Sequence, residues 1–232
     1  MIAAKRLYFK YEDDLVLKNV NLEIMKNSFT AVIGANGSGK TTLAKHFNAL
    51  LIPTKGEVLV DEISTKKDEL NARKNVGFVF QNFEEQIIHS IVEDDVAFGL
   101  ENLGFEEIRV RMLVDETLSR LKIRHLAKQN VNALSQGQKQ LVALAGVIAM
   151  NPKYIVFDEP TTNLDEKNKK NIMKIINDLN RKEKRTIILI TNVLDDLRHA
   201  NNVIVMKKGS IIFSGRKSEL SDKILRAAGL HD

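Results

Sequence analysis

The sequence predicts an α/β fold with a mostly parallel sheet as its core, an antiparallel β layer beside the sheet, and an inserted helical subdomain. Three observations lead to this fold class. A glycine-rich loop lies between an apolar strand-like run and a helix-like run, near residue 34. Short apolar runs typical of buried parallel strands recur on both sides of a long helical region. Within that region, between residues 91 and 128, strand signals stop and apolar residues recur at helical spacing.

The composition bounds the possible classes of protein. A chain of 232 residues, 44% hydrophobic and 28% charged, fits one large soluble domain or a core with an inserted lobe. Its longest uncharged apolar run, Leu141–Met150, is shorter than the roughly 20 residues that a membrane-spanning helix needs. The absence of cysteine excludes disulfides and thiolate metal sites. The net charge of +5 comes from scattered lysines and arginines, which we interpret as a solvated surface.

The first thirty residues contain two β-like runs, Ala4–Tyr11 and Leu15–Ile24, joined by an acidic, turn-prone segment. We expect them to form the antiparallel layer beside the core. Tyr11 ends the first run, where its ring could stack on a flat purine base. The alternative role for Tyr11 is that of a half-buried strand residue.

A phosphate-binding loop is the strongest single motif. Residues 34–41 read Gly-Ala-Asn-Gly-Ser-Gly-Lys-Thr and match the pattern G-x-x-x-x-G-K-[ST] at every fixed position. The loop follows the apolar run Phe29–Ile33 and precedes a helical stretch, Thr42–Leu51, that Pro53 stops. The glycines let backbone N–H groups approach phosphate oxygens, and the helix N-terminus adds its dipole. We therefore expect these nucleotide-binding residues: Gly34, Asn36, Gly37, Ser38, Gly39, Lys40, Thr41 and Thr42. Among them, the lysine should reach the β- and γ-phosphates and the first threonine should bind Mg²⁺.

Two further strands and a helical lobe follow the first helix. Gly56–Val60 and Val76–Phe80 read as strands separated by a charged connection. Gln81 ends the second strand, where its amide could bond Mg²⁺ or a water near the γ-phosphate; a solvated glutamine is the alternative. From Ile91 to Lys128, apolar residues recur at helical spacing and predict a small lobe of two or more helices.

The next helix begins with a capping signal. Residues 134–138 read Leu-Ser-Gln-Gly-Gln, and Ser135 is a good N-cap for a helix that Asn151-Pro152 stops. Such a helix start offers free N–H groups to an anion. Taken alone, the pattern describes only a capped helix.

Two adjacent carboxylates follow the buried-strand run Tyr154–Phe157. Burying them is unfavourable unless something binds them. Beside a phosphate loop, Asp158 can hold Mg²⁺ through its water shell, and Glu159 can orient and deprotonate the attacking water. Surface acids at a strand exit are the alternative.

The last third of the chain completes the sheet. Another buried strand, Thr186–Thr191, ends at Asn192. Val203–Met206 and Ser210–Ser214 flank a glycine turn and predict a hairpin that closes the sheet before a short C-terminal helix.

An ordered set of motifs resembles the ATP-binding-cassette (ABC) ATPases across essentially the whole chain. In order, the motifs are the phosphate loop, Gln81, residues 134–138, Asp158-Glu159 and Asp165. The resemblance implies one domain over residues 1–232, with ATP and Mg²⁺ as cofactors and ATP hydrolysis as the reaction. Its P-loop NTPase (RecA-like) core with the β layer would span residues 1–86 and 151–232, and the helical subdomain with the signature motif residues 87–150.

The family also implies roles for single residues. Its cassettes form head-to-tail dimers, with ATP between the phosphate loop of one chain and the signature segment of the other. Tyr11 would then stack on adenine, and Asp165, in Asn163-Leu164-Asp165, would cross the dimer interface. The signature residues in contact with the partner's ATP would be Ser135, Gln136, Gly137 and Gln138. The resemblance makes Glu159, Gln81 and Asn192 catalytic and Thr41, Gln81 and Asp158 the residues that hold the metal ion.

Three segments resemble a narrower group, the ATPases of energy-coupling factor (ECF) importers and related cobalt and nickel systems. They are Gln81-Asn82 with Gln86, residues 92–104, and residues 137–140 leading into 145–150. The likeness implies a peripheral protein at the cytoplasmic face of the cell membrane, bound to a membrane coupling subunit and a small membrane substrate-binding subunit. Vitamins or metal ions would be the cargo, Phe83–Gly99 the docking surface, and nucleic acid would not be a partner.

Two departures from the family pattern shape a hypothesis. Asn192 stands where the family usually has histidine, and it can carry neither a proton nor a positive charge. Gln136 stands where glycine is most frequent. Because the histidine is lost beside an intact Glu159, we expect one half of a heterodimer of ATPases with a weakened site of its own. A homodimer, in which Asn192 still bonds the phosphate, is the alternative. The alternative function is that of a non-transport cassette acting on nucleic acid or ribosomes, favoured only by the sequence pI of about 9.2.

Overall fold

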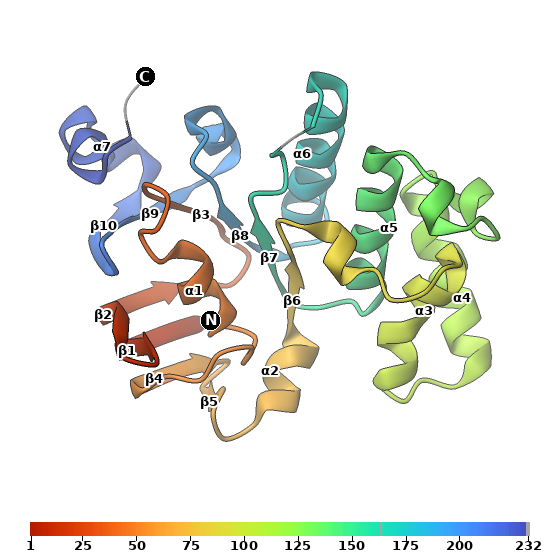
Figure 1. The fold of residues 1–232 in the computed structure, drawn as a ribbon, viewed down its shortest axis with the longest axis horizontal. Helices are drawn as coiled ribbons and strands as arrows, with labels where there is room; N and C mark the ends of the chain where they lie inside the picture. The colour runs from red at the N-terminus through yellow and green to blue at the C-terminus, as the bar shows by residue number, and fades with distance from the viewer. Residues whose placement is uncertain (163, 231–232) are drawn as a thin grey trace.

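The computed structural model describes residues 1–162 and 164–230 of the chain. Its centre is a six-stranded sheet of order β10-β9-β3-β8-β7-β6 (Figure 1). Neighbouring strands from β9 to β6 run parallel, and only β10 pairs antiparallel, with β9. The strands are β3 Phe29–Ile33, β6 Val76–Val79, β7 Tyr154–Asp158, β8 Thr186–Ile190, β9 Asn202–Lys207 and β10 Ser210–Arg216. Strands β3, β6, β7 and β8 are buried along their whole length, as their continuous apolar runs predict.

A second, antiparallel sheet of order β2-β1-β4-β5 lies beside the central one, at the lower left of Figure 1. Its strands are β1 Ile2–Tyr11, β2 Asp14–Ile24, β4 Lys55–Val60 and β5 Ile63–Ser64. The predicted antiparallel layer is therefore confirmed, and β4 joins it as a third strand by pairing with β1.

Seven helices accompany the sheets within the described residues. They are α1 Lys40–Lys45, α2 Glu69–Asn75, α3 Val92–Asn102, α4 Glu107–Arg120, α5 Gln136–Ala149, α6 Glu166–Arg181 and α7 Asp222–Ala228. Helices α3, α4 and α5 pack together on one side of the core, at the right of Figure 1. None of the helices in residues 1–162 and 164–230 is both long and apolar enough to span a bilayer.

Two local predictions need correction. The first helix spans Lys40–Lys45 and not Thr42–Leu51, because the chain turns back after it: the N–H groups of Leu50 and Leu51 both donate to the carbonyl of Lys45. The charged connection after β4 is also structured. It contains β5 and α2, whose N-cap Asp68 accepts a hydrogen bond from the N–H of Asn71 at 3.0 Å.

Two hydrophobic clusters hold these layers together. One joins the helical lobe and α6 to one face of the central sheet, and the other fills the space between the two sheets around α1. The parallel register aligns Val79 with Phe157 and Asp158 with Ile190. The residues that follow β3, β6, β7 and β8 therefore meet at one edge of the sheet, where ligands bind in open α/β folds.

Candidate functional site

The phosphate loop connects β3 to α1 in the conformation that its glycines allow. Gly34 has φ 153°, and a Cβ there would lie 2.3 Å from the carbonyl oxygen of Met206, so a larger residue does not fit. Gly39 adopts φ 100° immediately before α1. Both positions favour glycine, because L residues with a Cβ rarely adopt such positive φ angles. The loop thereby places the N-terminus of α1, with its free N–H groups, at the sheet edge.

Lys40 lies inside this loop. Its Nζ donates to the carbonyl oxygens of Gly34 at 2.8 Å and Ala35 at 3.3 Å. The side chain is buried, which lowers the pKa of Lys40, while the nearby Glu159 and Asp158 carboxylates oppose that shift. A buried ammonium bonded only to neutral carbonyls is well suited to receive a phosphate anion.

Thr41 and Asp158 meet across the sheet edge. The Thr41 hydroxyl donates to Asp158 Oδ1 at 3.0 Å, and only 3% of Asp158 is exposed. Burial raises the pKa of Asp158, and the neighbouring Glu159 adds to the rise, whereas the Thr41 bond and nearby lysines oppose it. A hydroxyl beside a buried carboxylate fits Mg²⁺, a hard cation that prefers oxygen ligands. No group of three or more His, Cys, Asp or Glu among the described residues could hold a metal, so a metal here would also need phosphate oxygens.

Glu159 lies beside this pair. Its Oε2 accepts a hydrogen bond from Gln81 Nε2 at 3.0 Å and a longer one from the Thr162 hydroxyl at 3.4 Å. Its backbone is held in the left-handed region at φ 47°, with its N–H bonded to the carbonyl of Ile190 at 2.9 Å. The structure thus brings Gln81 to Glu159 rather than to Asp158, and the backbone strain is of the kind found at functional sites.

Asn192 follows β8 and reaches back to the phosphate loop. Its Nδ2 donates to Asn36 Oδ1 at 3.2 Å. Asn192, which stands where the family usually has histidine, is therefore in direct contact with the phosphate loop. The two neutral amides make an ordinary hydrogen bond without charge assistance.

A cavity of about 490 Å³ covers the loop. Tyr11 lines it and is 46% exposed, and its ring packs edge-on against Phe9, with the centroids 4.8 Å apart. Val16 and Thr162 were missed by the sequence reasoning. Val16 lines the cavity, and the available signal was its place in the strand that follows the turn after Tyr11. Thr162 could have been found from its position three residues after Glu159. The lining residues are Tyr11, Val16, Asn36, Gly37, Ser38, Gly39, Lys40, Thr41, Thr42, Gln81 and Glu159.

The signature segment, residues 135–138, lies outside the loop cavity. Ser135 and Gln138 form the predicted cap of α5: Ser135 N–H donates to Gln138 Oε1 at 2.9 Å, and Gln138 N–H donates to Ser135 Oγ at 3.4 Å. None of residues 135–138 is among those that line the loop cavity. Asp165 caps α6 by accepting the N–H of Asn168 at 2.9 Å. Asn163, two residues earlier in the chain, lies outside the described residues.

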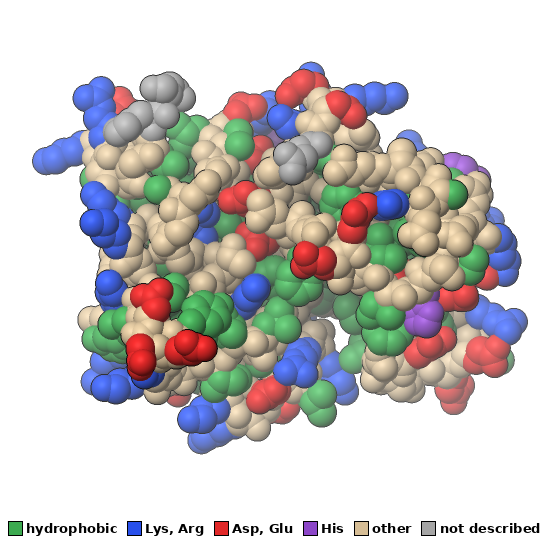
Figure 2. Space-filling model, in the orientation of Figure 1, with side chains coloured by type: hydrophobic (Ala, Val, Ile, Leu, Met, Phe, Trp, Pro, Cys, Tyr) green, Lys and Arg blue, Asp and Glu red, His purple; other side chains and the backbone are tan. Residues whose placement is uncertain are grey.

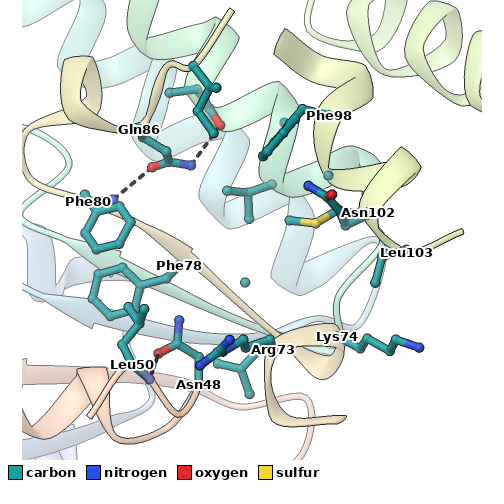
Figure 3. A pocket seen from close by; sticks show the side chains of 18 of the residues that line it. Asn48, Leu50, Arg73, Lys74, Phe78, Phe80, Gln86, Phe98, Asn102 and Leu103 are labelled. Atoms are coloured by element: carbon teal, nitrogen blue, oxygen red, sulfur yellow. Dashed lines mark hydrogen bonds between the residues drawn. The ribbon is translucent and has the colours of Figure 1, made fainter. Parts of the chain in front are cut away.

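A second hollow, of about 480 Å³, separates the core from the helical lobe (Figure 3). Phe78, Phe80 and Phe98 point toward it, and Arg73 and Lys74 lie at its border. Figure 2 shows hydrophobic side chains gathered around this hollow. We call it the lobe groove; it is lined by Asn48, Leu50, Leu70, Arg73, Lys74, Val76, Gly77, Phe78, Phe80, Gln86, Ile88, Asp95, Phe98, Gly99, Asn102, Leu103, Ala143, Gly146, Val147 and Met150.

Gln86 lies between the lobe groove and the residues around Glu159. Its Oε1 accepts the N–H of Phe80 at 3.2 Å, and its Nε2 donates to the carbonyl of Ala143 on α5 at 3.4 Å (Figure 3). Phe80 directly precedes Gln81, which bonds Glu159. One short path of contacts therefore runs from the groove to the predicted catalytic carboxylate.

Comparison with known proteins gives consistent likenesses. Residues 17–162 match the family model described as ABC transporter. The energy-coupling factor transporter ATP-binding protein EcfA1 of Clostridioides difficile strain 630 is 44% identical over 238 residues, covering 99% of this chain and 86% of that protein. Among solved structures, cbiO1 of Clostridium perfringens, described as part of the ABC transporter complex cbiONQ, has a TM-score of 0.85 and 35% identity, covering 99% and 94% of the two chains. A dimeric, post-hydrolysis ATP-binding cassette, MJ0796, bound to ADP and phosphate, has a TM-score of 0.83 and 30% identity, covering 93% and 98%.

Proposed function

Because the chain belongs to the ABC transporter ATPases and is an ECF-type ATP-binding subunit, we propose that it powers the uptake of a vitamin or metal ion through a membrane coupling subunit. The observation that carries the proposal is the match to ECF ATP-binding proteins over nearly the full chain, together with a phosphate loop, Thr41–Asp158 and Gln81–Glu159 at one sheet edge. The cbiO1 likeness, a protein from a membrane transporter complex, supports a peripheral position on the cytoplasmic face of the membrane.

In this proposal the chain's own residues bind and orient ATP. Tyr11 stacks on the adenine, and the loop N–H groups and Lys40 hold the phosphates, since a buried ammonium gains a charge-assisted bond there. Thr41 and Asp158, with Gln81 nearby, hold Mg²⁺, which when bound supplies positive charge to the β- and γ-phosphates.

Hydrolysis then depends on Glu159. Its carboxylate accepts a proton from the attacking water, and Gln81 holds the carboxylate in place by donating at 3.0 Å. Asn192 bonds the phosphate loop at Asn36 and can donate one neutral hydrogen bond toward the γ-phosphate. Because the Asn192 side chain carries no charge, we expect this site to hydrolyse ATP slowly.

A second ATPase chain completes the site. The chain's own residues 135–138 do not line its loop cavity, which supports a contact between the bound ATP and the signature of another chain. We propose that Ser135, Gln136, Gly137 and Gln138 do this for the partner's ATP and that Asp165 crosses the interface. The weakened Asn192 favours a heterodimer, in which the partner carries the faster site.

The membrane coupling subunit docks in the lobe groove, which overlaps the predicted surface Phe83–Gly99 only in part. The lining residues in that range are Gln86, Ile88, Asp95, Phe98 and Gly99. The occupant is an apolar helical segment of that subunit, because aromatic and aliphatic side chains make up much of the groove's lining. The contacts of Gln86 would transmit its movement to Gln81. A nucleic-acid function is not favoured, since the relatives are transporter subunits.

A matched pair of variants tests the docking. Leu70 lines the groove and is 69% exposed, whereas Ile108 is 84% exposed on α4 and does not line it. Burying a leucine contributes about 1.5–3 kcal/mol, so Leu70→Asp should reduce recovery of the membrane subunit roughly tenfold or more, and Ile108→Asp should not. Both variants should keep the ATPase rate of the detached dimer. Equal recovery with Leu70→Asp and Ile108→Asp would place the docking surface elsewhere.

A further inference from the structure

The two-residue turn between β9 and β10 contacts two walls of the loop cavity. Lys208 and Gly209 have φ angles of 46° and 82°, and such positive values are typical of tight hairpin turns. Turn residues are usually exposed, yet Gly209 is buried. The elements around it, the phosphate loop and β2, lie far from it in the sequence.

Both backbone groups of Gly209 bond to these elements. Its N–H donates to the carbonyl of Ser38 in the phosphate loop at 3.0 Å, and its carbonyl accepts the N–H of Lys18 in β2 at 2.9 Å. The Ser210 hydroxyl adds a longer bond to the carbonyl of Lys18, at 3.3 Å. Ser38 lines the loop cavity, and so does Val16, two residues before Lys18. The turn therefore joins one wall of the cavity to the other.

The space around Gly209 leaves no room for a side chain. A Cβ at this position would lie 1.9 Å from the carbonyl oxygen of Val16 and 3.5 Å from the Cα of Leu17, both backbone atoms of β2. Gly104 has a similar φ of 78°, but a Cβ there would meet nothing within 4 Å. A positive φ alone would also suit asparagine, whereas only glycine lets the turn approach β2 so closely. Turn geometry thus does not explain the close approach.

We propose that Gly209 is a positioning residue that sets the distance between the phosphate loop and the two residues that hold the base, Tyr11 and Val16. This inference rests on the proposed function, in which Tyr11 stacks on the adenine. A nucleotide binds through its base and its phosphates together, and the second contact adds affinity only where the spacing of the two sites matches the ligand. The turn holds that spacing before a nucleotide binds, so less order has to be gained on binding.

A side chain at position 209 should change this spacing. Real Cβ contacts are essentially never shorter than 3.0 Å, so the turn and β2 would have to separate by roughly 1 Å from the 1.9 Å contact with Val16. Tyr11 pairs with Asp14 of β2, so a shift of β2 would carry the base-binding residues away from the phosphate loop. A shift of the turn would instead move its bond to Ser38.

The test compares the affinity of the transporter complex for ADP with its affinity for inorganic pyrophosphate, which has the two phosphates without ribose and base. Both are titrated with Mg²⁺ by calorimetry, with the ATP site of the partner chain inactivated. Gly209→Ala is the test variant. Gly104→Ala is the matched control, because it strains the backbone at a similar φ without any close contact. Tyr11→Ala marks the loss of stacking, and thermal unfolding shows whether each variant is folded.

The wild type should bind ADP about 5- to 150-fold more tightly than pyrophosphate, the range that stacking one base on an aromatic ring supplies. Gly209→Ala and Tyr11→Ala should lose most of this preference and keep their affinity for pyrophosphate, whereas Gly104→Ala should keep both. An unchanged preference in Gly209→Ala, including an equal loss of affinity for the two ligands, would overturn the spacing role. A wild type without the preference, or a Tyr11→Ala variant that keeps it, would instead contradict the stacking in the proposed function.

Ser210→Ala provides the test if Gly209→Ala does not fold. It removes the bond from the hydroxyl to the Lys18 carbonyl without adding an atom. The loss of one hydrogen bond between the turn and β2 should lower the preference for ADP by about twofold or more. A folded Ser210→Ala variant with the wild-type preference would overturn the role of the turn.

Discussion

Replacing Asn192 by histidine tests the idea that this chain carries a weakened site. Asn192 Nδ2 bonds Asn36 Oδ1 at 3.2 Å, so its side chain already lies against the phosphate loop. The Asn192 amide can already donate a hydrogen bond to a charged phosphate, so the gain from histidine is the added attraction between two charges. Two unit charges 4 Å apart attract by about 1 kcal/mol in water and by more near a protein surface. Because a protonated imidazole is charged and reaches further than the amide, Asn192→His should stabilise the transition state by about 1–1.5 kcal/mol. That gain corresponds to a roughly 5- to 13-fold higher kcat at this site.

The assay is steady-state phosphate release by the assembled dimer whose other site has been inactivated in the partner chain. Asn192→Gln is the control, because it lengthens the side chain without adding charge, and it should change kcat little. The gain from histidine should also shrink as pH rises through about 6.5, where imidazole loses its proton. An unchanged rate in Asn192→His, or an equal gain in Asn192→Gln, would refute the reasoning that the missing charge limits this site.

Three further predictions follow from the geometry. Glu159→Gln removes the proton acceptor held by Gln81, so kcat should fall by about 10²–10⁴ while ATP binding, measured by equilibrium titration, is retained; an active variant would exclude Glu159 as the base. Burial raises the pKa of Asp158 and so makes the nucleotide-free protein less stable as pH rises through that pKa. Asp158→Asn should remove this pH dependence in thermal unfolding and abolish Mg²⁺-dependent hydrolysis. A variant that keeps either property would contradict the role of Asp158. Burial lowers the pKa of His46 to about 4, so the free energy of unfolding should fall by about 3 kcal/mol as pH drops from about 6.5 towards 4. In urea titrations, His46→Leu should flatten this dependence on pH. The control variant His125→Gln, at an exposed position, should leave it unchanged.

Much of the fold could be predicted because its signals are local. Short stretches of sequence are enough to predict several elements. These are the buried strands β3, β7 and β8, the turn between β9 and β10, and the helix cap at Ser135. The end of α1 could not be predicted, because it depends on how residues 46–51 turn back. Helix α2 was missed because only Leu70 and Ala72 among its seven residues are apolar, too few for a periodic signal.

The site residues likewise include some that local sequence predicts and others whose contacts depend on the folded chain. The phosphate loop and Asp158-Glu159 could be named from the sequence, since the chemistry requires those residue types next to each other in the chain. The contact between Gln81 and Glu159 joins residues 78 positions apart and depends on the register of β6 and β7. The lobe groove was likewise invisible, because its walls come from α2, β6, α3 and α5 and meet only in the folded chain.

The most direct measurement of the central claim is purification of this subunit, carrying an affinity tag, from its native membrane, with the associated chains identified by mass. The account predicts a second cassette ATPase, a membrane coupling subunit and a small membrane substrate-binding protein. Their recovery should depend on the lobe groove, so that Leu70→Asp loses the membrane chains and keeps the second ATPase. Recovery of nucleic acid or ribosomal proteins without any membrane chain would contradict the account and remove the docking role of the groove.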